Sequence, residues 1–255
     1  MKIYLLHKNN AKEKRKESTN LFTKIKDLFY PMHCPVCDTI ICRRKGLICP
    51  ECSEIPRRVK EPRCVCCGKH LADESGVRCR DCSGRTRSFE YGVALYEYSS
   101  VHDSIYAFKN LGRGEYAEYY GREICHQLMP DIQRMNADAL IPIPLHSSKL
   151  RKRGYNQAAL LAKEIAKGCG LPVREDVLKR IQKTSAQKKM NHADRQNNMK
   201  KAFHMEQNDV KLDTVILVDD VFTTGSTIEA AAKELKRGGV NKVFYVALAI
   251  GKGLS

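Results

Sequence analysis

The sequence predicts an α/β protein with a mostly parallel sheet flanked by helices, preceded by a small cysteine-rich module. From residue 88 onward, short apolar runs alternate with segments of helical periodicity, the order typical of parallel sheets. Between Cys34 and Cys82, paired cysteines recur at a fixed spacing. One apolar run, residues 215–218, leads into two aspartates and a loop of small hydroxyl residues. Ligands bind at such strand ends in open α/β sheets.

The composition is that of a globular protein with a basic surface. The 255 residues are 42% hydrophobic, and the net charge is +16. Residues 1–90 carry 20 Lys and Arg against 11 Asp and Glu, and the remainder carries 25 against 18, so the excess is spread along the chain. Phosphorylated ligands or nucleic acid would explain this charge, and a solvated basic surface is the alternative.

The apolar segments of the chain are short. None approaches the roughly 20 residues that cross a bilayer. The stretch Ile3–Leu6 near the N-terminus is too short for the hydrophobic region of a signal peptide. We therefore expect a cytoplasmic protein with no membrane insertion.

Ten of the twelve cysteines fall between Cys34 and Cys82, and eight of these form two units of one design. Each unit has a Cys-x-x-Cys pair, eleven intervening residues and a second Cys-x-x-Cys pair, and the units are offset by 30 residues. Because cytosolic disulfides are rare and two such turns can hold one ion tetrahedrally, the units predict two Zn²⁺ sites. The expected ligands are Cys34, Cys37, Cys49 and Cys52 for the first site, and Cys64, Cys67, Cys79 and Cys82 for the second.

Both zinc ions are expected to be structural, because four thiolates leave no open position for catalysis. They would hold together a module that is too small to fold on its own core. The spacing also allows an interleaved arrangement, in which one site draws on both units. Cys42 and Cys66 are left over and are expected to be free thiols.

The chain ahead of the cysteines divides into two parts. Residues 9–18 are too polar to bury a core, and we expect the basic N-terminus to be disordered. Apolar residues from Leu21 to Phe29 recur at helical spacing, and Pro31 ends that segment. The predicted organisation is a disordered basic N-terminus (1–20), a helix plus double zinc ribbon (21–87), and the α/β domain (88–255).

Hydrophobic periodicity gives the elements of the α/β domain in order. The run at 215–218 is continuously apolar, which is typical of a strand buried on both faces. In the segment 155–167, Ala158, Leu161 and Ile165 share one helical face. The predicted strands are 93–98, 139–143, 215–218 and 243–250, and the predicted helices are 116–128, 155–167 and 226–237.

The segment after residue 215 predicts a binding site. Asp219 and Asp220 are expected at the strand tip, where they would accept hydrogen bonds from ligand hydroxyls. The residues that follow can form a phosphate loop, because backbone N–H groups and a helix N-terminus favour an anion and glycine permits close approach. A ribose 5-phosphate combines hydroxyls and phosphate in this way. The loop residues are Thr223, Thr224, Gly225, Ser226 and Thr227.

A purely local interpretation of the same segment is a helix start. Ser226 and Glu229 have the spacing of a capping box, and Gly238 and Gly239 would end the helix. This interpretation explains the helix but neither the paired aspartates nor the paired threonines. Ligand binding is therefore the preferred interpretation.

The segment 215–227 resembles the signature with which type I phosphoribosyltransferases bind 5-phosphoribosyl-1-pyrophosphate (PRPP). The stretches 141–146 and 150–158 resemble the most specific motif of the ComF family, which is associated with natural competence and DNA uptake. An arginine-rich stretch over 180–203 and the double ribbon are also similar to that family. Two positions depart from its pattern, since Arg113 stands where aspartate is usual and Lys201 replaces a glycine.

The resemblance implies a role for each part of the site. Asp219 and Asp220 would hold the ribose and steady it during any transfer, and Mg²⁺ would accompany PRPP. Residues 182–199 would form a lid, with Lys188, Lys189 and Arg195 near the pyrophosphate. Residues 144–154 would bind the pyrophosphate, and a solvated basic loop is the alternative; Pro144, Lys149, Arg151, Lys152, Arg153 and Gly154 belong to this stretch, with His146 as a secondary candidate.

Three functions are compatible with these features. The first is a PRPP-binding protein of the ComF type that acts in DNA uptake, with ribbons that contact single-stranded DNA or a partner such as a competence helicase. The second is an active phosphoribosyltransferase in nucleobase salvage. The third is a zinc-ribbon regulator that binds nucleic acid and senses PRPP. The sequence contains no recognisable element for reading an acceptor base, so it does not by itself imply catalysis.

Overall fold

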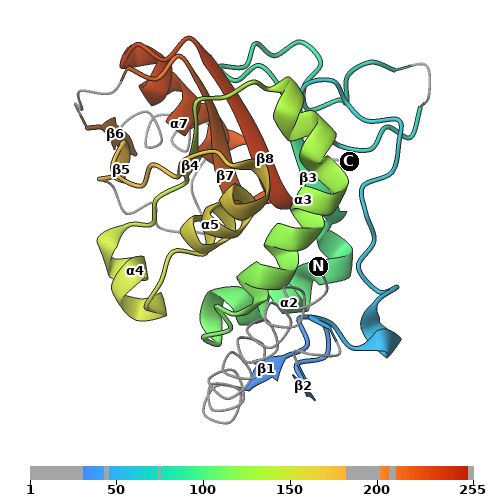
Figure 1. Cartoon of the computed structure of the whole chain (residues 1–255). Coiled ribbons are helices and arrows are strands. Elements are labelled where there is room, and N and C mark those ends of the chain that lie inside the picture. Colours follow the sequence, from blue (N-terminus) through green and yellow to red (C-terminus); the bar gives the residue numbers. More distant parts are fainter. Residues whose placement is uncertain (1–30, 43–45, 74–75, 182–201, 207–210, 252–255) are drawn as a thin grey trace, which may run out of the picture.

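The computed structural model describes residues 31–42, 46–73, 76–181, 202–206 and 211–251. The N-terminal segment 1–20, the helix expected before Pro31, and the lid at 182–199 with Lys188, Lys189 and Arg195 lie outside these residues. Figure 1 shows helices on both faces of a central sheet, with the cysteine-rich segments along one side. The predicted α/β class with an N-terminal double ribbon is confirmed.

The described part of the central sheet has four parallel strands in the order β3-β8-β7-β4. Side chains of β7 alternate between the two faces, so that Val215 and Leu217 face one layer while Ile216 and Val218 face the other. Both layers are apolar, which explains the unbroken hydrophobic run. The strands are β3 (Gly92–Glu97), β4 (Ala139–Pro142), β7 (Thr214–Phe222) and β8 (Lys242–Ile250).

Helices cover both faces of the sheet (Figure 1). One face packs against α2 (Tyr98–Asn110), α3 (Tyr116–Arg134) and α5 (Gln157–Cys169). The other face packs against α7 (Ser226–Arg237), the antiparallel pair β5 (Leu178–Arg180) and β6 (Phe203–Met205), and the second cysteine unit. The short helix α4 (Ser147–Arg153) follows β4 and buries no residue. No helix in the described ranges combines the length and apolarity needed to cross a membrane.

The first cysteine unit contains small regular elements. Strands β1 (Met32–His33) and β2 (Ile40–Ile41) pair antiparallel around the first Cys-x-x-Cys turn. The 3₁₀ turn η2 (Pro50–Cys52) carries the second pair. In the second unit, an isolated bridge joins Arg63 to His70.

Several element boundaries differ from prediction. Helix α3 was expected to end at Leu128, yet it passes Pro130 and continues to Arg134, because Ile132 is buried against the sheet. Helix α5 begins at Gln157 rather than at residue 155, because the Asn156 side chain accepts a hydrogen bond from the Ala158 amide and caps it. Helices α2 and α4 and the pair β5–β6 were not predicted.

Two corrections concern the segment around the candidate site. The strand expected to stop at Val218 continues to Phe222, because β8 keeps pairing with its backbone as far as Ile250. The capping box is also wrong. Gly225 is the N-cap of α7, and the Glu229 carboxylate instead accepts hydrogen bonds from the amide and hydroxyl of Ser88, at 2.9 and 2.8 Å.

Candidate functional site

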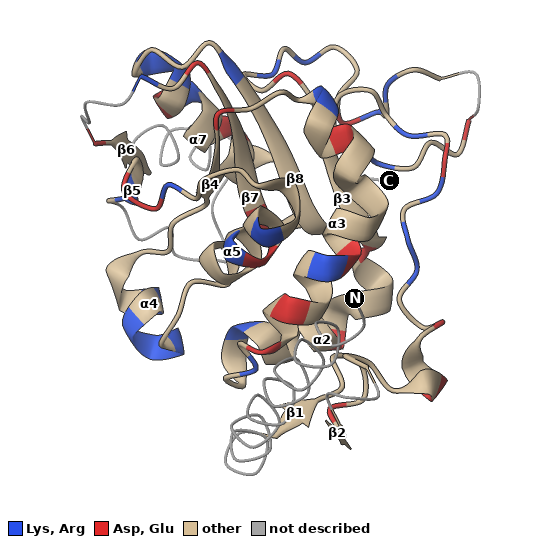
Figure 2. Ribbon diagram, viewed as in Figure 1, with Lys and Arg blue, Asp and Glu red and all other residues tan. Residues whose placement is uncertain are grey.

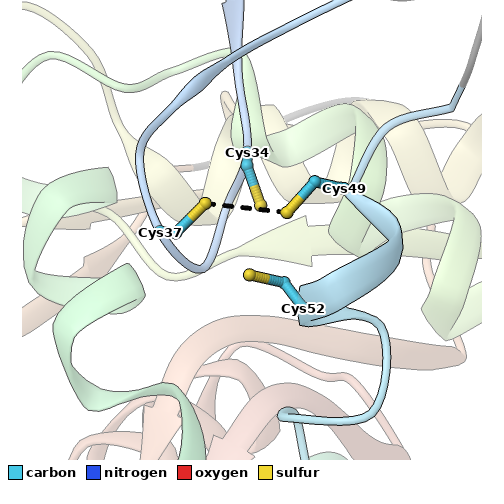
Figure 3. A group of neighbouring side chains, drawn as sticks. All are labelled: Cys34, Cys37, Cys49 and Cys52. Carbon is cyan, nitrogen blue, oxygen red and sulfur yellow. Dashed lines mark hydrogen bonds between the residues drawn. The ribbon is translucent and has the colours of Figure 1, made fainter.

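The cysteines of the first unit converge on one point. Figure 3 shows the side chains of Cys34, Cys37, Cys49 and Cys52 turned toward one another. Their sulfur atoms lie within 4.8 Å of one another, and Cys37 Sγ lies 3.6 Å from Cys49 Sγ. In a tetrahedral site with Zn–S bonds of about 2.3 Å, the sulfur atoms lie about 3.8 Å apart. The first unit therefore fits a closed zinc site.

The second unit has the same geometry. Its four sulfur atoms, from Cys64, Cys67, Cys79 and Cys82, also lie within 4.8 Å of one another. Each cluster draws its cysteines from a single unit, so the interleaved arrangement is excluded. Cys42 and Cys66 belong to neither cluster; Cys42 is exposed and Cys66 is buried. Four thiolates fill the shell of each ion, which suits structural zinc.

The two clusters differ in their surroundings. In the first, Cys37 is exposed, and hydrogen bonds from Thr39 lower the pKa of its thiol to about 6, which favours the thiolate that zinc requires. In the second, three cysteines are buried and belong to the core of the α/β domain. The buried Tyr245 hydroxyl donates a hydrogen bond of 2.7 Å to the Cys67 carbonyl oxygen. The second ribbon is therefore built into the main core.

The contact between the first ribbon and the α/β domain is partly polar, and Leu47 and Ile48 of the ribbon pack partly buried against the apolar core. The Arg113 guanidinium donates two hydrogen bonds to the Asp38 carboxylate, at 2.7 and 2.8 Å, and the Tyr116 hydroxyl donates a third at 2.6 Å. The Arg113 hydrogen bond is the main reason that the pKa of Asp38 lies below its usual value. Arg113, which departs from the ComF pattern, thus has a specific partner in the ribbon.

The two predicted site aspartates lie inside β7. Strand β4 stops pairing with β7 at Pro142 and Val218, so the edge of β7 that faced β4 is open at Asp219 and Asp220. They were expected to follow the strand, and in fact they precede its last two residues. The location still matches the expectation in one respect, because the carboxylates lie at the C-terminal end of the central strands.

A lysine that the sequence analysis did not select completes this acidic pair. Lys109, near the end of α2, lies with its Nζ 2.6 Å from Oδ1 of the buried Asp220. Burial and the charge of Asp220 raise the pKa of Asp219 to about 7, against the opposing attraction of Lys109. Asp220 is thus held in an ion pair, while the pKa of Asp219 is raised toward neutrality.

Further cations act on these carboxylates. Partial burial lowers the pKa of Lys149, and repulsion by Arg180, Arg153 and Lys109 lowers it further, so these four charges lie close enough to interact. Burial also lowers the pKa of Arg180, against attraction by Asp219. The Arg153 guanidinium donates to the buried Gln157 side chain at 2.8 Å. The acidic pair is thus surrounded by positive charge, which suits a ligand that carries both hydroxyls and phosphates.

The loop after β7 has the features of a phosphate site. Gly225 has φ +78°, and a Cβ atom there would lie 2.6 Å from Cζ of Phe222, so a residue with a side chain does not fit. The hydroxyls of Thr224 and Ser226 are exposed and lie 3.0 Å apart. Amides at the start of α7 carry the positive end of the helix dipole.

The predicted site residues are only partly brought together. Asp219, Asp220 and the loop 223–227 are neighbours, and Arg153 acts on Lys149 beside them. The residues expected in a pyrophosphate loop instead form helix α4 over 147–153, with Pro144 half-buried before it. Arg151 and Gly154 are exposed, and the structure records no contact between them and the carboxylates. Gly154 ends α4 in a left-handed conformation, with φ +82°.

Sequence reasoning missed Lys109 as a site residue. The signal was present, because Val101, Ile105 and Phe108 recur at helical spacing and are all buried on one face of α2. A helix predicted from this spacing would have Lys109 in its last turn. Arg180 was noted only as part of a family-like stretch.

Comparisons with known proteins agree with the geometry. A family model for the double zinc ribbon domain matches residues 25–83, and one for the phosphoribosyl transferase domain matches residues 151–253. The chain is 31% identical over 212 residues to competence protein F of Haemophilus influenzae, covering 78% of this chain and 89% of the relative. The chain belongs to the ComF family. The family resemblance seen in the sequence is therefore confirmed.

Other ComF-family relatives carry two kinds of name. DNA utilization protein YhgH of Escherichia coli is 28% identical over 201 residues, covering 77% of this chain and 87% of the relative. Competence protein ComFC of Bacillus subtilis is 25% identical over 203 residues, covering 75% of this chain and 79% of the relative. In all three relatives the alignment covers most of both chains.

Proposed function

We propose that this ComF-family protein binds PRPP at the junction of β7 and α7 and acts in DNA uptake during natural competence. The observation that carries the PRPP site is the pairing of Asp219 and Asp220 with the loop 223–227, beside a group of cations. The carboxylates can accept hydrogen bonds from the ribose hydroxyls of a ligand. The loop a few residues later can bind the 5-phosphate of the same ligand.

Each part of the ligand has a matching group in the proposed site. The loop amides and the Thr224 and Ser226 hydroxyls would hold the 5-phosphate, and the two carboxylates would accept hydrogen bonds from the ribose hydroxyls. Lys149 and Lys109 would face the pyrophosphate. Mg²⁺ prefers carboxylate and phosphate oxygens, so Asp219 and Asp220 are the residues that fit it, and the ion would neutralise pyrophosphate charge.

The proposed DNA role rests on exposed cations. On the second ribbon, Arg78, Arg80 and Arg85 are exposed and form no ion pair with a described carboxylate. Figure 2 also shows that much of the α4 ribbon is blue, the colour of Lys and Arg. Unpaired cations of this kind bind a phosphate backbone without reading bases. The names of the relatives, which refer to competence and DNA utilization, support this role.

One experiment addresses both parts of the proposed function. PRPP with Mg²⁺ is titrated calorimetrically into the full chain, and pyrophosphate release is followed with single-stranded DNA and with a panel of nucleobases. Saturable PRPP binding supports the site. Base-dependent pyrophosphate release would instead favour the salvage transferase, and absence of PRPP binding would refute the site assignment.

The raised pKa of Asp219 predicts a pH dependence of PRPP affinity. Ligand hydroxyls need the ionised carboxylate as acceptor, so below the pKa of about 7 binding requires loss of a proton. We expect affinity to rise as pH increases from 5.5 to 7, by up to about tenfold per pH unit, and to level off above 7. Calorimetry in buffers of different ionisation enthalpy measures the proton release. Affinity that falls over this range would contradict the assignment of Asp219 as acceptor.

Single-stranded DNA binding is expected to be strongly salt-dependent. If about four phosphates are neutralised, affinity should fall roughly 50-fold between about 50 and 200 mM salt. Changing Arg78, Arg80 and Arg85 to glutamine should reduce both affinity and salt slope. The matched control changes Arg122, Lys163 and Lys167 to glutamine. This variant also loses three positive charges, but each of these residues already has a carboxylate partner. Equal losses in both triple variants would show that the ribbon is not the DNA surface.

A further inference from the structure

The segment that leaves the second ribbon contacts the phosphate loop. Arg87 Nη2 donates to the carbonyl oxygens of Asp81, in the ribbon, and of Thr224, in the loop, both at 3.4 Å. Its Nη1 lies 3.5 Å from the position that a Cβ on Gly225 would take. The Arg87 guanidinium therefore lies against the backbone of the loop and joins it to the ribbon.

The guanidinium of Arg87 lies close enough to the second cysteine cluster for its charge to act on Cys66. Its Nε is buried and, of the buried side-chain nitrogen and oxygen atoms in the described ranges, is the one without a hydrogen-bond partner. No carboxylate of the described residues forms an ion pair with it, and its guanidinium stacks over the Phe89 ring at 5.7 Å. Four thiolates around one Zn²⁺ would carry a net negative charge that offsets part of the cost of desolvating this cation, and an anion bound in the loop would offset more of it.

The position of Arg87 is fixed from two sides. Next to it, Ser88 is held by both carboxylate oxygens of Glu229 on α7. Phe89 packs edge-on against Phe222 and Tyr245, which stack on each other at 4.6 Å. The Tyr245 hydroxyl in turn binds the Cys67 carbonyl. The second ribbon, residues 87–89 and the loop thus form one packed unit.

The contact with Thr224 also orients the loop. In a trans peptide the C=O and N–H groups point in opposite directions. Because the Thr224 carbonyl points to Arg87, the Gly225 amide of the same peptide points away from it. That direction leaves the amide available to an anion on the other side of the loop.

We propose that Arg87 is a positioning residue for the 5-phosphate, so that the second ribbon supports the phosphate loop from the side opposite the bound anion. This inference rests on the proposed function, since it takes the ligand to be a ribose phosphate. It also links the second zinc ion to ligand binding. By thermodynamic reciprocity, a ligand held by the loop must stabilise the ribbon as much as the ribbon stabilises the bound ligand.

The test compares ligands that carry different phosphates. In Arg87→Met, affinity for ribose 5-phosphate and for PRPP should fall by about tenfold or more, while affinity for pyrophosphate with Mg²⁺ stays unchanged. Arg87→Lys should recover part of the loss, and the exposed neighbour provides the control Arg85→Met. Zinc content should remain as in wild type. Unchanged ribose 5-phosphate affinity in Arg87→Met, or an equal loss in Arg85→Met, would overturn the proposal.

A second measurement separates this inference from the proposed function. Ribose 5-phosphate should slow the release of one zinc ion per chain to a chelating dye in wild type, but not in Arg87→Met. If wild type binds neither sugar phosphate, the proposed function fails. In that case, amide hydrogen exchange of residues 222–229 tests the positioning role. Faster exchange in Arg87→Met than in wild type would support this role, and unchanged exchange would refute it.

Discussion

Replacing both Asp219 and Asp220 by alanine should lower PRPP affinity by at least about a hundredfold. Hydrogen bonds to charged groups are each worth about 1.5–3 kcal/mol, and at least two would be lost together. The loss should be selective. Removing Asp220 frees Lys109 from its ion pair, so binding of pyrophosphate without Mg²⁺ should be retained or strengthened while ribose 5-phosphate binding is lost. Calorimetric titration with the three ligands measures both effects.

The controls for this experiment keep the fold and the charge change comparable. Asp103, whose side chain is 97% exposed, provides a single carboxylate control far from β7, and the double asparagine variant preserves side-chain shape at the site. Zinc content should equal that of wild type in every variant. If the double alanine variant bound PRPP as tightly as wild type, the site assignment would be wrong.

Loss of the second zinc ion should destabilise the protein far more than loss of the first. Cys49 and Cys79 occupy equivalent positions in the two units and are both half-buried, so Cys49→Ser and Cys79→Ser form a matched pair. Three cysteines of the second cluster belong to the core of the α/β domain, whereas the first ribbon contacts that domain through polar groups and the partly buried Leu47 and Ile48. Structural zinc contributes about 10 kcal/mol or more to the folding of its module.

We expect two zinc ions per chain in wild type and one in each serine variant, by elemental analysis. If Cys79→Ser loses even half of the free energy that the zinc ion contributes to folding, its Tm should fall by more than about 10 °C. The Tm of Cys49→Ser should fall by only a few degrees. If Cys79→Ser is insoluble, stepwise chelation of wild type gives the same comparison through near-ultraviolet tyrosine signals. Equal Tm shifts in the two variants would contradict the integration of the second ribbon into the core.

The central sheet could be predicted because its strands are continuous apolar runs, and the short turn between β7 and α7 was also expected. The strand end could not be predicted, because Asp219 and Asp220 interrupt the apolar pattern while β8 continues to hydrogen-bond the backbone. Glu229 is a second case in which a tertiary contact overrides the local sequence pattern. Its spacing from Ser226 fits a local cap, but a tertiary partner, Ser88, takes its carboxylate.

The candidate site was predicted where its residues are adjacent in sequence and missed where they are distant. The loop 223–227 and the aspartates form one motif. Lys109 reaches Asp220 from a helix more than a hundred residues earlier, and Arg87 reaches Thr224 from the ribbon. Helical spacing could have indicated α2 and the place of Lys109 on it, but neither contact can be read from local sequence, because each depends on which surfaces the strand order brings together.

The pairing of Arg113 with Asp38 has an evolutionary consequence. A relative that has the usual aspartate at position 113 and also keeps Asp38 would place two negative charges against each other. The two positions should therefore change together among ComF sequences. The way in which the first ribbon is attached would then be a property of particular lineages, acquired separately from the more deeply packed second ribbon.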